Sequence, residues 1–213
     1  MNKTELKNAS IDSIESMADF YEKTADEIWE NPELSLKEYK AAALYCRILR
    51  EHGFDVREKL CGIDTAFCGS FGSGRPYIGI LGKFNADIAE TVMEKTHDLT
   101  EPLNDFLMPY YSGTGFTAGS TDVGDVSWLT PAAQIETATW PSGMPLHTWQ
   151  TVACGKSSIA YKGMLCAGKV MAASAIDLIE DPELLKAARE EFKRRAKGGY
   201  TCPIEPETVP TAL

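Results

Sequence analysis

Residues 156–179 read KSSIAYKGMLCAGKVMAASAIDLI and carry the strongest helical pattern of the chain. Apolar and small residues recur there at steps of three and four, which predicts one amphipathic helix. Its apolar face is formed by Ile159, Ala160, Gly163, Met164, Ala167, Val170, Met171, Ala175 and Leu178. Because many of these side chains are small, the helix can lie close against a β-sheet, which favours an α/β fold.

The segments around this helix supply the other layers. A helix is predicted from Ile11 to Trp29, and a second one starts at an N-cap, Ser35, with Glu38 three residues later. Strands are predicted near residues 54–82 and 131–139, and a last helix opens at Pro182. We therefore expect a three-layer α/β/α sandwich with a central mixed sheet, in a single domain that spans residues 1–213.

Composition narrows the classes of partner. The chain has 213 residues, 44% of them hydrophobic, and a formal net charge of -10, which disfavours nucleic acid and anionic membrane surfaces. A polar N-terminus without a signal-peptide core, and the lack of any run long enough to span a membrane, predict a cytoplasmic protein. The six cysteines form no Cys-x-x-Cys pair, so reduced core thiols are predicted rather than disulfides or a zinc knuckle.

The candidate site lies in two blocks, residues 120–128 and 145–150. His147 follows a proline-rich turn and precedes a helix, a position where α/β sheets place ligands, so it is a candidate metal ligand or acid/base. Asp122 and Asp125 are three residues apart and would share one face of a helical turn, as metal-binding or water-polarising carboxylates do. The alternative for them is an N-cap at Asp122 and a solvated Asp125.

Other polar residues have more ordinary explanations. His52 and His97 each lie at a predicted helix end, where an imidazole complements the helix dipole. A metal-free hydrolase that uses Ser120 or Ser127 with His147 and Asp122 is a further alternative, but no Gly-x-Ser-x-Gly nucleophile elbow is present. The site therefore points first to metal chemistry.

Several blocks together resemble the p-aminobenzoyl-glutamate hydrolase group of the dinuclear-zinc amidohydrolases and peptidases, the family of aminoacylase and carboxypeptidase G. They are residues 24–33, 120–128, 145–150, 161–164 and 200–204. The resemblance implies zinc or manganese as cofactor, and an N-acyl amino acid or dipeptide-like molecule as substrate. It also implies pairing with a second copy or another subunit. By the same resemblance His147 is the last metal ligand, and the residues that contact the substrate or support that ligand are Ser120, Thr121, Asp122, Asp125 and Trp149.

The chain departs from this family after Gly82. Family members are much longer, and their first metal ligands, catalytic glutamate and lid or dimerisation domain belong in the part that should follow this strand. Here Asn85 stands where the family has its metal-bridging aspartate, so a seam is predicted near residues 82–85. One imidazole cannot hold a catalytic zinc, which needs about three protein ligands. We expect an amidohydrolase with impaired activity, or alternatively a non-catalytic scaffold or subunit-interaction module.

Overall fold

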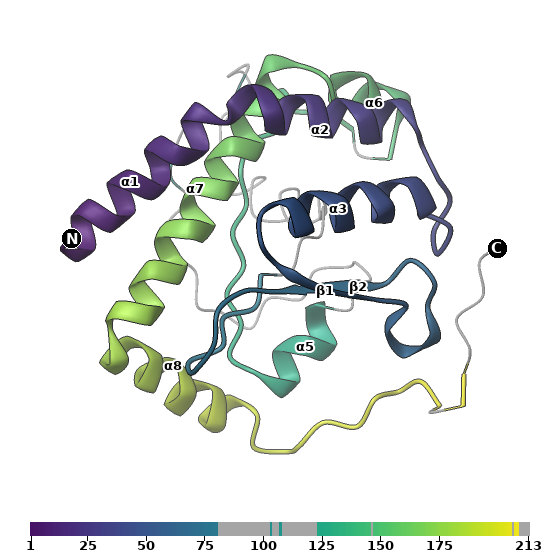
Figure 1. Cartoon of the computed structure of the whole chain (residues 1–213). Coiled ribbons are helices and arrows are strands. Elements are labelled where there is room, and N and C mark those ends of the chain that lie inside the picture. Colours follow the sequence, from purple (N-terminus) through teal and green to yellow (C-terminus); the bar gives the residue numbers. More distant parts are fainter. Residues whose placement is uncertain (81–102, 104–106, 108–122, 146, 206, 209–213) are drawn as a thin grey trace. The chain divides into compact units, whose positions relative to one another are not determined.

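The computed structural model describes residues 1–80, 103, 107, 123–145, 147–205 and 207–208, and Figure 1 shows their elements. The chain groups into two compact units, one of residues 1–19 and 78–201 and one of residues 20–77 and 202–213. The predicted seam at residues 82–85 lies outside the described residues. Within the described helices, none is both long and apolar enough to cross a membrane.

In the first unit, helix α1 (Lys3–Ser16) packs against helix α7 (Ser158–Glu180). Lys3 and Lys7 place their ammonium groups 2.8 and 2.6 Å from the carboxylate of Asp177 on α7. Both ammonium groups donate hydrogen bonds to this carboxylate and lower its pKa, and the bond from Lys3 has the larger effect. A second ion pair joins Lys169 of α7 to Glu15 of α1. The two helices are therefore linked by charge near both ends of α1.

Helix α7 confirms the prediction from which the fold was derived. It begins after Ser157, whose side chain accepts a hydrogen bond from the amide of Ala160 at 3.2 Å. Gly163 is buried, and a Cβ atom there would meet the carbonyl oxygen of Ala138 and approach the Cγ2 atom of Thr139 to 2.8 Å. The small face of the helix therefore does permit a close approach, although to residues 137–139 rather than to a sheet.

The strand predicted at residues 131–139 is wrong. These residues form neither a strand nor a bridge, and the Thr137 hydroxyl donates a 3.0 Å hydrogen bond to the carbonyl of Gly163 on α7. Residues 131–136 are exposed, and only residues 137–139 lie against α7, so the alternation does not correspond to alternating burial. A strand requires a ladder partner as well as a pattern, and residues 131–139 have none among the described residues.

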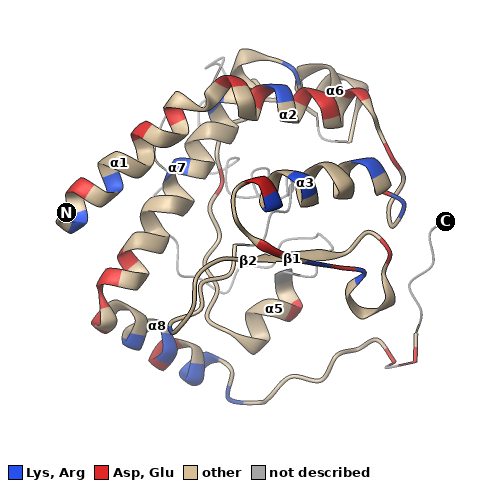
Figure 2. Cartoon of the chain, in the orientation of Figure 1, with Lys and Arg blue, Asp and Glu red and all other residues tan. Residues whose placement is uncertain are grey.

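The last helix, α8 (Pro182–Arg195), has the predicted ends. The Asp181 side chain accepts a 3.1 Å hydrogen bond from the amide of Leu184, and Pro182 occupies the first turn. The basic residues Lys193, Arg194 and Arg195 lie in its last turn, and Figure 2 marks basic residues along α8 in blue. This placement complements the negative end of the helix dipole.

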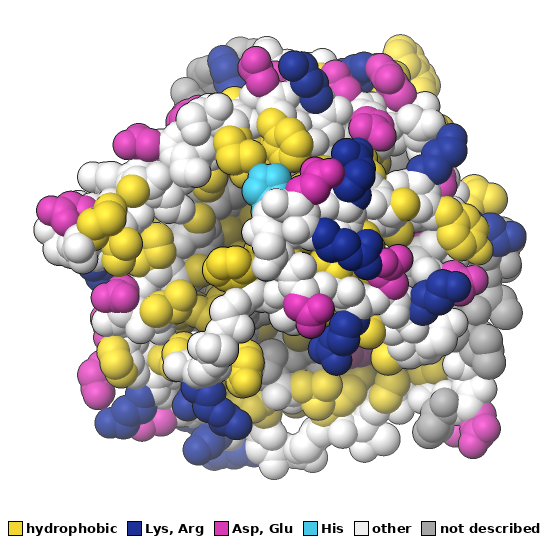
Figure 3. All heavy atoms as spheres, in the orientation of Figure 1, with side chains coloured by type: hydrophobic (Ala, Val, Ile, Leu, Met, Phe, Trp, Pro, Cys, Tyr) yellow, Lys and Arg dark blue, Asp and Glu magenta, His cyan; other side chains and the backbone are white. Residues whose placement is uncertain are grey.

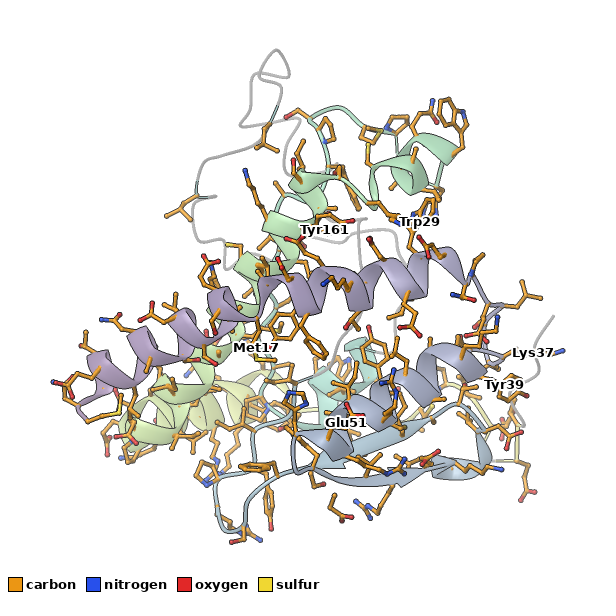
Figure 4. All side chains as sticks on the ribbon, turned by 45° about the horizontal axis from the view of Figure 1, so that its top comes forward. Met17, Trp29, Lys37, Tyr39, Glu51 and Tyr161 are labelled. Atoms are coloured by element: carbon orange, nitrogen blue, oxygen red, sulfur yellow. The ribbon has the colours of Figure 1, made fainter. Side chains whose placement is uncertain are left out.

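The helix predicted from Ile11 to Trp29 is two helices in the structure. Helix α1 begins eight residues earlier, capped by the reciprocal hydrogen bonds of Asn2 and Glu5 at 3.0 and 2.8 Å. It ends at Ser16, and helix α2 (Ala18–Glu30) follows after Met17, which Figure 4 labels at the junction. The break contains neither proline nor glycine, so no local signal in the sequence marks it.

In the second unit, the start of helix α3 (Tyr39–Glu51) corrects the predicted Ser35 cap. The carboxylate of Glu33 accepts hydrogen bonds from the amides of Lys40, at 2.9 and 3.0 Å, and Ala41, at 3.0 Å. Figure 4 shows Tyr39 and Glu51 at opposite ends of α3. A charged cap six residues before the helix therefore replaces the local capping box.

Gly53 follows the C-terminal cap of α3 and reverses the chain there. That glycine has φ 84°, and its amide donates to the carbonyl of Arg50 at 3.0 Å, while the amide of Phe54 donates to the carbonyl of Leu49 at 3.0 Å. These two hydrogen bonds define a Schellman motif, which needs a left-handed residue at this position. The turn directs the chain into the first strand.

Strands β1 (Asp55–Glu58) and β2 (Phe67–Ser70) form a two-stranded antiparallel sheet in which Val56 lies opposite Gly69. A short 3-10 helix, η1 (Leu60–Gly62), lies between them. Helix α3 packs on this pair and buries Leu44 and Cys46. The ring of Tyr45 stacks on that of Phe67, with centroids 6.1 Å apart. A helix on a sheet is therefore the packing of this unit.

The predicted α/β class agrees with these elements, and the predicted strands are present in part. The strands predicted near residues 54–60 and 65–71 are confirmed, whereas residues 77–80 form no strand. The described residues contain one antiparallel strand pair, so the central mixed sheet and the three-layer sandwich stay predictions.

The cysteines are all reduced, as predicted, but only one belongs to the core. Cys46 is buried, and its burial is the main reason why the pKa of its thiol is raised. Cys61, Cys166 and Cys202 are exposed, so the prediction of core thiols is wrong for these three.

Candidate functional site

Three of the predicted site residues are described by the structure: Asp125, His147 and Trp149. The others, Ser120, Thr121 and Asp122, lie outside the described residues, as do Asn85 and His97. All three described residues belong to the first unit.

His147 lies in a turn directly before helix α6 (Trp149–Cys154). Its side chain is exposed, and its backbone has φ 56°, in the left-handed region. A residue with a Cβ atom costs about 1–2 kcal/mol in this conformation, and such residues concentrate at functional sites. Leu36, Lys59 and Cys61 share this backbone region, so the conformation alone does not distinguish His147 as a functional residue.

The turn around His147 is held by one carbonyl. The oxygen of Pro145 accepts hydrogen bonds from the hydroxyls of Thr148, at 2.7 Å, and Thr151, at 2.9 Å. Both threonines belong to the beginning of α6, so the carbonyl fixes the chain on either side of His147. Trp149, in the first turn of α6, is 76% exposed and presents its indole to solvent.

Asp125 lies on helix α5 (Val123–Leu129), and its Oδ1 atom accepts a hydrogen bond from the hydroxyl of Tyr200. The ring of Tyr200 also stacks on Trp128, with centroids 6.2 Å apart and planes 15° apart. Asp125 is therefore only partly solvated, and its carboxylate has a partner that neither interpretation of the sequence predicted. Nothing in the local sequence connects position 125 with position 200.

The structure argues against Ser127 as the nucleophile of a metal-free hydrolase. The Ser127 hydroxyl donates a 2.7 Å hydrogen bond to the carbonyl of Gly124, one turn earlier on α5. Its proton is directed to a backbone carbonyl rather than to a general base. Ser120, the other candidate, lies outside the described residues.

His52 has the structural role predicted for it. It is the C-terminal cap of α3, and its Nδ1 atom lies 2.9 Å from the carbonyl oxygen of Ile48. Its ring also lies 5.9 Å from that of Phe20. The imidazole is therefore engaged in closing the helix end.

The described residues do not fit a catalytic metal by themselves. Among them, no three histidine, cysteine, aspartate or glutamate side chains gather in a way that could hold a metal ion. His147 offers one imidazole, whereas a catalytic zinc takes about three protein ligands. We therefore derive no chemical step through a metal.

Two further features contain none of the predicted site residues. Glu136 remains exposed, but neighbouring atoms shield it from part of the solvent and raise its pKa, while Gln134 donates to it at 3.3 Å. A hollow of about 170 Å³ lies between α2 and α3 in the second unit. It is lined by Glu27, Ile28, Asn31, Lys40, Ala41 and Leu44.

The comparison with known proteins confirms the resemblance. The chain is 44% identical over 106 residues to one of the subunits of p-aminobenzoyl-glutamate hydrolase from Escherichia coli (strain K12). The match covers 49% of this chain and 22% of that protein, so the chain spans a small part of its relative. No family model and no solved structure matches the chain.

Proposed function

We propose that this chain takes part in hydrolysis of the amide bond of N-acyl amino acids such as p-aminobenzoyl-glutamate, and that it is a weak catalyst alone. The observation that supports this proposal most directly is the 44% identity over 106 residues to a subunit of a p-aminobenzoyl-glutamate hydrolase. The three-layer sandwich and the zinc or manganese cofactor belong to the same proposal. The low activity follows from His147 being the single imidazole among the described residues of the candidate site.

The described geometry is compatible with this substrate class. Such a substrate carries an aromatic ring, an amide and carboxylates. The exposed indole of Trp149 offers a face on which an aryl ring can stack. The exposed imidazole of His147, two residues earlier, would supply a ligand or an acid/base group near that ring.

The test is metal loading combined with product release. The chain is incubated with zinc or manganese, and bound metal per chain is measured by elemental analysis. Release of p-aminobenzoate from p-aminobenzoyl-glutamate is followed by chromatography. We expect weak metal binding and slow turnover in the parent chain, and loss of both in His147→Ala.

His52→Ala is the matched control, since this histidine closes a helix end. It should bind metal and turn over substrate like the parent. Equal metal content and turnover in His147→Ala and the parent would remove His147 from the proposed site. Two tightly held ions per chain with rapid turnover would show that the chain is a complete enzyme.

A second candidate function is that of a non-catalytic scaffold or subunit-interaction module. The relative is named as a subunit of its hydrolase. Large apolar side chains are exposed on the described residues, including Trp149 at 76% and Val152 at 61% on α6. Figure 3 colours the side chains by type and shows hydrophobic, acidic and basic ones at the surface.

A further inference from the structure

The second unit contains a hollow of about 170 Å³ between the end of α2 and the first turns of α3. Part of its lining is apolar, because Leu44 is 6% exposed and Ile28 and Ala41 are half-buried. A cavity of about 150 Å³ admits a benzene molecule, so the hollow has room for an apolar side chain of that size.

The polar part of the lining carries one charge of each sign. Glu27 and Lys40 are both exposed, and their charged groups do not form an ion pair with each other. The Glu27 carboxylate makes no hydrogen bond or ion pair with another described residue. A carboxylate only accepts hydrogen bonds and an ammonium group only donates them, so each can bind a ligand group of the opposite charge.

The ammonium group of Lys40 is held at the hollow by two hydrogen bonds in series. Its Nζ atom donates to Oδ1 of Asn31 at 3.0 Å, and Nδ2 of Asn31 donates to the backbone carbonyl of Glu27 at 2.8 Å. These bonds join the beginning of α3 to the end of α2. An ammonium group has three donors, and Asn31 uses one of them, which leaves two for a ligand.

We propose that this hollow binds a free α-amino acid with an apolar side chain, such as leucine. The ligand's carboxylate accepts hydrogen bonds from Lys40, its ammonium group donates to Glu27, and its side chain is removed from water against Ile28, Ala41 and Leu44.

A zwitterion is the class of ligand that satisfies both charges at once. The end of a peptide chain carries only one of the two charges beside its terminal side chain. The lining includes none of the residues of the proposed hydrolase site, so the inference is independent of the proposed function.

The first experiment measures binding to the full chain and needs no turnover. Leucine is titrated into ¹⁵N-labelled protein, and we expect saturable shifts of the amide resonances of residues 27–31 and 40–44. A dissociation constant of about 1 mM is typical of so small a ligand. Leucinamide, which lacks the carboxylate, and N-acetylleucine, which lacks the ammonium group, should each bind about tenfold more weakly. Equal binding of leucinamide and leucine, or no saturable shift with leucine, would overturn the proposal.

The second experiment places the ligand in the hollow. Ala41→Leu fills the space with a residue that suits a helix, Lys40→Met removes the ammonium group, and Glu27→Gln removes the negative charge. Each variant should bind leucine about tenfold more weakly than the parent.

Lys37→Met and Glu22→Gln are the matched controls, since both positions lie outside the lining, and they should bind leucine like the parent. Circular dichroism checks that every variant is folded. Parent-like binding in the folded Ala41→Leu and Lys40→Met variants would show that leucine binds elsewhere and would overturn the assignment of this site.

Discussion

At the scale of single residues, Gly163 is the position where the structure has least room. A Cβ atom there would meet the backbone oxygen of Ala138, and backbone cannot move aside as a flexible side chain can. We expect Gly163→Ala to lower the free energy of unfolding by about 1–3 kcal/mol, the usual cost of overpacking. Urea denaturation followed by circular dichroism measures this change.

Gly168 provides the matched control because it lies on the same helix and has nothing within 4 Å of a Cβ atom. Gly168→Ala should raise the free energy of unfolding by up to about 1 kcal/mol, the helix propensity difference between the two residues. Equal effects of the two substitutions would show that residues 137–139 do not contact α7 at Gly163 in solution.

The sequence could select individual candidate residues, but it did not predict which side chains contact them. His147 and Asp125 could be selected because their types and neighbours are unusual, and the structure gives His147 a left-handed backbone and Asp125 a hydrogen bond. Tyr200 was missed as the partner of Asp125 because the two lie 75 positions apart. Contacts at such a separation depend on how the chain returns, which no local pattern contains.

At the scale of elements, the start of α3 depends on a titratable cap. The pKa of Glu33 is lowered, first by the hydrogen bond from the Lys40 amide and then by that from Ala41. A carboxyl with a lowered folded pKa stabilises the protein above the pKa of an unfolded glutamate, about 4.3. That stabilisation is lost as the pH falls through the folded pKa. We therefore expect acid to weaken α3 in the parent chain.

Glu33→Gln should remove this part of the acid dependence, because the amide side chain does not titrate. Urea midpoints measured between neutral pH and about pH 3 should fall less steeply in the variant than in the parent. Ser35→Ala tests the competing N-cap from the sequence and should leave the curve unchanged. A larger effect of Ser35→Ala than of Glu33→Gln would restore the local capping box.

Helix ends were predicted correctly where a capping residue lies next to the end that it stabilises. The ends of α7 and α8 follow from Ser157, Asp181 and Pro182, each of which acts on the next few residues. The strand predicted at residues 131–139 failed because an alternating pattern does not supply a ladder partner; residues 131–136 are exposed, and residues 137–139 lie against α7. In the structure α7 contacts this segment, through the Thr137 hydroxyl among others.

At the scale of the whole molecule, the sequence predicted the class of fold but not the extent of the sheet. Helix α3 packs against β1 and β2, and both strands lie within the region where strands were predicted. A mixed sheet would need pairing between strands far apart in the chain. Composition and periodicity carry no information on that pairing, whereas the resemblance to a hydrolase group was specific enough to be confirmed.

Exposed aromatic side chains lead to a prediction about association. Phe71, Tyr77 and Trp149 are 72%, 82% and 76% exposed, and aromatic residues are enriched at protein interfaces. We expect a mixture of this chain with its relative, the p-aminobenzoyl-glutamate hydrolase subunit of Escherichia coli, to contain a heavier species than either protein alone, measured by analytical ultracentrifugation. Trp149→Ser should weaken this species, while Ser127→Ala, a change at a small exposed hydroxyl, should not. If the mixture sediments as the sum of its separate components at every concentration, the subunit-interaction function is contradicted for this partner, and the amidohydrolase proposal must rest on the chain alone.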